Sequence, residues 1–278
     1  MPARSWRWPD PHVKPPYGAA EIDWGHPLAT GLAQASVFNE GGGAPVDLVN
    51  GVVGTIVPTV AWETTALGVG LAMKQAASVG TVTFPHLASY NPSTECTVFC
   101  IASLLTYDGT THGVFYHGGV NASTGVGMDL HNGLSGRLTC YVNNASEVLI
   151  TDTALWPGSG TTGLHSMAFT YKAGDRSKVF TDGTLRTDNA ATAASVTTTT
   201  NVLTWGSRRP DRTVSDWNGT IVVGYFYTVQ KSDSAIQWLS AEPYALLRPI
   251  VRRRYFVPAA AGLSIPVAMH HRHMQMSA

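Results

Sequence analysis

The stretch from Gly163 to Arg186 most constrains what this chain can fold into, because it has the pattern of two strands joined by a turn. Apolar and polar residues alternate through its first half, HSMAFTYK, and this period of two is typical of a strand with one buried face. Ala173-Gly174-Asp175 follows and favours a turn, since glycine adopts positive φ without steric cost. The next run ends in Asp182-Gly183, a strong indication of a two-residue hairpin turn. The sequence therefore predicts a β-meander.

Short runs with the same character continue on both sides of this meander. They predict strands at 52–57, 69–74, 79–84, 95–105, 112–117, 125–131, 136–142 and 148–151. Asp-Gly, Gly-Gly and Asn-Gly pairs separate several of these runs, and such regular spacing is typical of a β-sandwich or barrel. One helix is predicted over 232–239, with Ser232 as its N-cap and with Ile236 and Leu239 facing inward.

The segments HSMAFTYK and KVFTDGTLR resemble the central hairpin of laminin-G-like modules, which belong to the concanavalin A-like β-sandwich superfamily. Similar matches flank it in the expected order, at 33–50, 94–104 and 203–240. The resemblance implies an all-β, concanavalin A-like jelly-roll β-sandwich over residues 21–240, in which His165 is a packed structural residue. Because this superfamily includes lectins, glycosidases and interaction modules, the resemblance predicts a fold and leaves the activity open.

The two ends of the chain, 1–20 and 241–278, are rich in proline and are predicted to be extended arms. Proline fixes φ and removes an amide donor, so such segments cannot build regular structure alone. Exposed aromatic side chains on an arm favour docking on another surface. We therefore expect a homo-oligomer or another partner to be contacted by Trp6, Trp8, Tyr17, Arg252, Arg253, Arg254, Tyr255 and Phe256.

Composition excludes several classes of function. Charged residues make up 13% of the chain and the formal net charge is zero, against a usual charged share of about 25%, so no nucleic-acid partner is expected. No apolar run reaches about 18 residues, which argues against a membrane span.

Cys96 and Cys100 would lie about 13 Å apart on one strand, too far for a disulfide. Together with Cys140 they are expected to be buried, reduced thiols.

Catalytic patterns are missing from the sequence. The glycosidases of this superfamily carry the carboxylate pattern E-x-D-x-x-E, because two carboxylates about 5 Å apart are needed for the nucleophile and the acid/base. None of the six glutamates has that spacing, and the G-x-S-x-G and H-E-x-x-H motifs are absent. We expect no enzyme activity, no catalytic residue and no required cofactor. Some relatives bind Ca²⁺ through loop oxygens, and the residues that would offer them, unless they only form turns, are Asp129, Asn132, Asp182, Asp211, Asp216 and Asn218.

Three functions fit these observations. The first is a non-enzymatic virion protein of the capsid decoration or cement type, since EIDWGHPLATGL near the start and AEPYALLRPIVRRRYF near the end resemble accessory proteins of tailed bacteriophages. Its partner would be the major capsid protein or another virion protein, and it would be made in the host cytoplasm without a signal peptide. The alternative is a glycan-binding adhesin whose loops present Trp205, Asp211 and Asp216, with Trp217 and Tyr225 as further candidates unless they are core residues. A glycoside hydrolase is a distant third.

Overall fold

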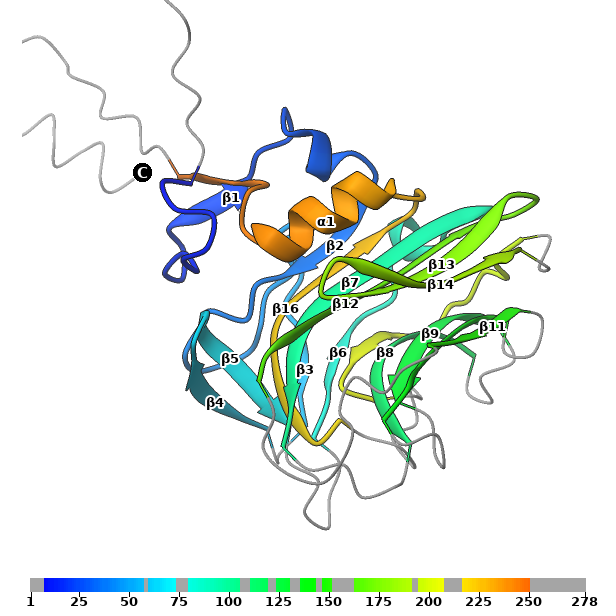
Figure 1. The fold of residues 1–278 in the computed structure, drawn as a ribbon. Coiled ribbons are helices and arrows are strands. Elements are labelled where there is room, and N and C mark those ends of the chain that lie inside the picture. The colour runs from blue at the N-terminus through cyan, green and yellow to red at the C-terminus, as the bar shows by residue number, and fades with distance from the viewer. Residues whose placement is uncertain are drawn as a thin grey trace, which may run out of the picture.

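The computed structural model describes residues 8–57, 60–73, 80–105, 111–119, 124–130, 136–143, 147–151, 163–191, 195–207 and 217–250 of the 278-residue chain. Strands are the main regular element of its described part, and they form two antiparallel sheets and a short two-stranded ribbon. The two large sheets face each other as a β-sandwich (Figure 1). The predicted fold class, an all-β jelly-roll sandwich, is confirmed.

The smaller sheet contains seven strands. In spatial order they are β11 (Glu147–Ile150), β10 (Leu138–Val142), β9 (Gly125–Leu130), β8 (His112–Gly118), β15 (Leu203–Trp205), β6 (Val82–Phe84) and β3 (Thr55–Ile56).

The larger sheet contains eight strands. Its order is β14 (Thr184–Ala190), β13 (Arg176–Thr181), β12 (His165–Lys172), β7 (Glu95–Leu104), β16 (Gly219–Tyr227), β5 (Gly68–Met73) and β4 (Val60–Thr65), and β2 (Leu32–Ser36) also pairs with β16. The short 3-10 helices η1 (Pro27–Ala29) and η2 (Ala88–Tyr90) lie in connections.

Most of the predicted strands are present. The runs at 95–105, 112–117, 125–131 and 136–142 form β7 to β10, with ends that differ by at most two residues. The runs at 69–74 and 148–151 correspond to β5 and β11, whereas those at 52–57 and 79–84 are strands only at 55–56 and 82–84. The predicted helix is α1 (Asp233–Ala241), and the side chain of Ser232 accepts a hydrogen bond from Ala235 N at 3.2 Å, as an N-cap does.

The main core lies between the two sheets. Met167, Phe169 and Tyr171 of β12 point into it, as the alternation predicts, and Cys96 and Cys100 of β7 point to the same side. Both thiols are free and buried, and burial raises their pKa values well above the ordinary range. They therefore act as small apolar side chains.

The larger sheet is also covered on its outer face, which the sequence does not predict. Helix α1 lies across this face (Figure 1), and Ile236 and Leu239 pack there with Ala168 of β12 in a second apolar cluster. Strand β12 is therefore buried on both faces except at its ends. Successive side chains of β12 point alternately into the main core and toward the second apolar cluster. The expectation of one buried face and one solvated face is therefore wrong for this strand.

The segments next to the chain ends pack against their own sandwich. Strand β1 (Ala20–Ile22) pairs with β17 (Leu247–Pro249), and Trp8 N donates to Leu247 O at 2.9 Å. Tyr244, Leu246 and Leu247 are buried in the second apolar cluster, the outer cluster, which covers the outer face of the larger sheet. The packed structure thus includes residues 8–20 and 241–250, so the expected boundaries at 20 and 240 do not mark its edges.

Lys14 anchors the N-terminal segment. Its side chain reaches below the surface, where Nζ donates to the carbonyl oxygens of Val69, Val222 at 2.6 Å and Phe38 at 3.2 Å. Val222 lies where the pairing of β16 with β7 shifts register. A segment in which prolines reduce the number of amide donors is thus held in part by a side-chain donor.

Candidate functional site

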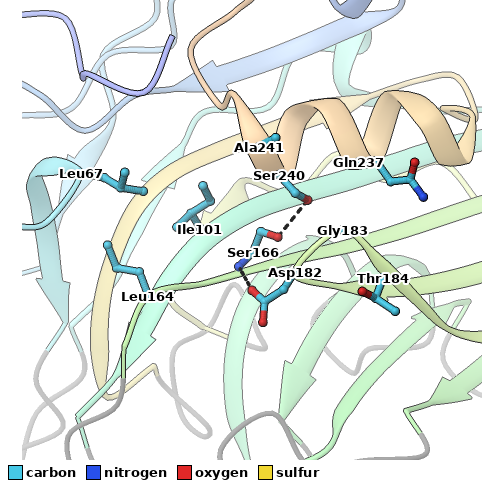
Figure 2. A pocket seen from close by; sticks show the side chains of 10 residues that line it. All are labelled: Leu67, Ile101, Leu164, Ser166, Asp182, Gly183, Thr184, Gln237, Ser240 and Ala241. Carbon is cyan, nitrogen blue, oxygen red and sulfur yellow. Dashed lines mark hydrogen bonds between the residues drawn. The ribbon is translucent and has the colours of Figure 1, made fainter. Parts of the chain in front are cut away.

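An open groove with a volume of about 460 Å³ lies on the outer face of the larger sheet, beside the C-terminal half of α1 (Figure 2). Its walls are the helix, the β4–β5 turn and the turn between β13 and β14, and its floor is formed by β7 and β12. The lining residues are Leu67, Ile101, Leu164, Ser166, Asp182, Gly183, Thr184, Gln237, Ser240 and Ala241.

The floor is set by strand register. Ser166 of β12 lies directly opposite Ile101 of β7, so their side chains emerge on the same face of the sheet. Both residues are buried, and Leu164, which precedes β12, is half-buried against the same outer cluster. The floor is therefore rigid and mainly apolar, with one hydroxyl group in it.

The turn between β13 and β14 places a carboxylate at the end of the groove. Asp182 and Gly183 have φ values of 49° and 70°, which the predicted two-residue hairpin turn requires. Asp182 N donates to Ser166 O at 2.9 Å, and Asp182 Oδ1 accepts from Ser166 N at 3.0 Å. A Cβ atom on Gly183 would lie 3.3 Å from Ser240 Cβ, so glycine also permits the close approach of the helix.

His165 completes the environment of this carboxylate. Its Nδ1 lies 2.7 Å from Asp182 Oδ2. Burial raises the pKa of Asp182, but the hydrogen bond and charge of His165, the Ser166 amide and the charge of Arg186 outweigh it and leave this pKa below its usual value. Asp182 is therefore ionised at neutral pH and presents a hydrogen-bond acceptor.

Helix α1 supplies the opposite wall. Gln237, Ser240 and Ala241 are spaced i, i+3 and i+4, so they share one side of the helix. The hydroxyl of Ser166 donates to Ser240 Oγ at 2.9 Å, which joins the helix to the floor. Gln237 and Ala241 are exposed, and Figure 2 shows the side chain of Gln237 above the groove.

The lining of the groove contains a single carboxylate, that of Asp182. Most glycoside hydrolases use a pair of carboxylates, and the groove does not present that pair. The described residues contain no group of three or more His, Cys, Asp or Glu side chains that could hold a metal ion. None of the helices in the described ranges is long and apolar enough to cross a bilayer.

The expectation that Trp205 contacts a glycan at an exposed loop is wrong. Its side chain lies fully inside the main core, where Nε1 donates to Gln34 Oε1 at 3.3 Å and the ring packs 4.7 Å from that of Phe115. Trp217 and Tyr225 are also fully buried. Asp211 and Asp216, the other two residues of that expected site, lie outside the described residues.

The residues expected to dock on a partner have different outcomes. Trp8 is half-buried against its own sandwich and Nε1 donates to Val13 O at 2.8 Å, and its role in docking on a partner stays a prediction. Tyr17 is 60% exposed, and its docking role stays a prediction. The others lie outside the described residues: Trp6, Arg252, Arg253, Arg254, Tyr255 and Phe256.

The sequence analysis identifies the turn at Asp182 and the helix, but not the groove between them. Thr184, Gln237 and Ser240 line the groove without belonging to any recognisable motif. Their proximity depends on how α1 crosses the sheet, so the Asp-Gly turn was the one available indication of the site.

Comparison with known proteins finds structures of similar fold but no match by sequence. No family model matches the chain, and no curated protein sequence does. The binding domain of Paraclostridial Mosquitocidal Protein 1 is similar, with a TM-score of 0.60 and 11% identity over 77% of this chain and 52% of that one. Botulinum neurotoxin type C, whose cell entry depends on interaction with two ganglioside molecules, is also similar. Its TM-score is 0.58, with 8% identity over 77% of this chain and 51% of that one.

A third similar structure is domain 4 of AbnA, an extracellular GH43 arabinanase from Geobacillus stearothermophilus, in complex with arabinotriose. Its TM-score is 0.56, with 15% identity over 80% of this chain and 99% of that domain. This chain spans about half the length of the chains of the mosquitocidal protein and of botulinum neurotoxin type C. The likenesses show the fold alone.

Proposed function

We propose that this chain is a non-catalytic carbohydrate-binding module and that the groove beside α1 holds the saccharide. The observation that carries the proposal is the convergence of polar groups from β12, the β13–β14 turn and α1 on one open groove, without a second carboxylate. Two structures of similar fold support it: botulinum neurotoxin type C depends on two ganglioside molecules for cell entry, and domain 4 of AbnA is in complex with arabinotriose.

The lining offers the hydrogen bonds that a sugar ring needs. Asp182 accepts through its carboxylate, Gln237 both donates and accepts, and the hydroxyl of Thr184 does the same. Apolar side chains on the floor can contact the C–H faces of the ring, so a few placed polar groups above an apolar surface give both affinity and orientation.

The test is binding of the full chain to a glycan array, followed by titration calorimetry with the best ligand. Gln237→Ala and Thr184→Ala each remove one exposed polar contact and are expected to weaken binding by about five- to tenfold. Asn189→Ala, at an exposed position on β14 away from the groove, is the matched control and leaves affinity unchanged. An array without any bound glycan would overturn the proposal.

The role of a virion decoration protein remains a prediction. It depends on the arms, and most of the residues expected to dock lie outside the described ranges. The two segments nearest the sandwich, 8–20 and 241–250, pack on it instead. The groove favours the glycan-binding alternative, on a virion or on a cell surface.

A further inference from the structure

The groove is divided into two chemically different halves. Figure 2 shows Leu67, Ile101 and Leu164 together at one end, while Asp182, Thr184 and Gln237 lie toward the other. Leu67 and Leu164 are half-buried at the rim of the outer cluster, so part of their apolar surface faces the groove. A ligand that fills the whole groove must therefore have a polar part and an apolar part.

The charge of the lining is equally selective. Asp182 is its sole charged side chain, and no Lys or Arg is among the residues that line it. Arg186 does not line the groove; its Nε donates to Thr181 Oγ1 at 2.7 Å, and its charge acts on Asp182 from outside the lining. An acidic sugar would find no cation in the groove and would meet the carboxylate of Asp182, which costs free energy at short range.

We infer that the groove selects an uncharged saccharide that carries an apolar substituent, such as the methyl group of an N-acetyl. The hydroxyl-bearing part of the ring lies at the Asp182 and Gln237 end, and the substituent lies among Leu67, Ile101 and Leu164. This inference rests on the proposed function, because it names the class of saccharide that the same groove takes. It excludes sialylated and uronic-acid ligands.

The size of the expected preference for an apolar substituent follows from the apolar surface that the substituent buries in the groove. Moving one methyl group from water onto an apolar surface strengthens binding about fourfold. Because no Lys or Arg lines the groove, an acidic group placed near Asp182 is expected to weaken binding at least tenfold. Both ratios refer to matched saccharides that differ in a single substituent.

The experiment uses the full chain on an array of matched pairs, such as lactose with N-acetyllactosamine and lactose with 3′-sialyllactose. The expected result is that, among the bound glycans, the N-acetyl member is preferred about fourfold and the acidic member is disfavoured. Leu67→Ala and Leu164→Ala are each expected to remove the N-acetyl preference. Leu185→Ala, at an exposed leucine that does not line the groove, keeps it, and thermal unfolding verifies that each variant is folded.

The outcomes separate the inference from the proposed function. If acidic glycans bind best, or if N-acetylation has no effect while other glycans bind, the inference fails and the glycan-binding function stands. If the leucine variants retain the full preference, the placement of the substituent is overturned. If no glycan binds, both the inference and the proposed function fail.

Discussion

The hydroxyl of Ser166 on β12 lies 2.9 Å from that of Ser240 on α1, and this hydrogen bond fixes the helix over the floor of the groove. Ser166 is also joined through its backbone to Asp182 on the neighbouring turn. One buried residue thus connects the floor, the helix and the carboxylate. The width of the groove depends on these contacts.

Ser240→Ala removes one partner and leaves the Ser166 hydroxyl without its acceptor in a largely buried place. The free energy of unfolding is expected to fall by about 1–2 kcal/mol, measured by urea denaturation. The double variant Ser166→Ala with Ser240→Ala should recover part of this loss, since both polar partners are then gone. Ser93→Ala, at an exposed serine in the connection before β7, is the control; an equal effect there would contradict the assigned contact.

Lys14→Met tests how the N-terminal segment is held. Burial lowers the pKa of Lys14 to about 7, while the charge of Glu40 raises it. Methionine has a similar length but cannot donate to the three carbonyls, so the free energy of unfolding should fall by about 2 kcal/mol. Proteolysis within residues 8–20 should also become faster. If Lys14→Met is cleaved no faster than a variant of the half-exposed Lys172, the anchoring role is wrong.

His117 makes the fold sensitive to acid. Burial, together with the charge of His86, lowers its pKa from 6.5 to about 4, against a backbone hydrogen bond to Val202 that raises it. Between pH 6.5 and 4 the unfolded chain binds a proton that the folded chain does not, so stability falls as the pH falls through this window, by about 3 kcal/mol in total. Urea midpoints at pH 7 and pH 4.5 measure the fall. His117→Gln should reduce this dependence, and an unchanged pH slope in the variant would exclude His117 as its source.

Variants of Trp205 test whether this side chain belongs to the core or contacts the ligand. Trp205→Ala is expected to lower the free energy of unfolding by about 3–5 kcal/mol, because it leaves a large cavity between the sheets. The milder Trp205→Phe should remain folded and bind glycans with unchanged affinity. Weaker glycan binding by folded Trp205→Phe, with the midpoint of unfolding unchanged, would restore Trp205 as a surface contact.

Local patterns predicted the parts of this fold that local chemistry determines. The alternation around Phe169 and the turn at Asp182-Gly183 depend on neighbouring residues, and both are found where the sequence places them. The four-residue spacing of Cys96 and Cys100 on one strand likewise places both thiols on the same face. These features need no knowledge of distant partners.

Long-range packing accounts for what the sequence did not predict. Prolines near Lys14 exclude regular structure, but they do not reveal that its ammonium reaches the carbonyl of Val222, 208 residues away. The burial of Trp205 depends on Gln34, 171 residues away. The groove likewise depends on Ser240 meeting Ser166, which lies 74 residues earlier. In each case a residue's environment is decided by a partner that periodicity cannot identify.

The most direct test of the glycan-binding groove is to fill it. Ala241 is exposed and lines the groove at the end of α1, so Ala241→Trp blocks the space while removing no polar contact. Titration of the best array glycan should show a loss of affinity of at least tenfold for Ala241→Trp and none for Ser234→Trp, which lies outside the groove on the same helix. Equal affinity of Ala241→Trp and the unaltered chain would contradict the assignment of the groove as the saccharide site.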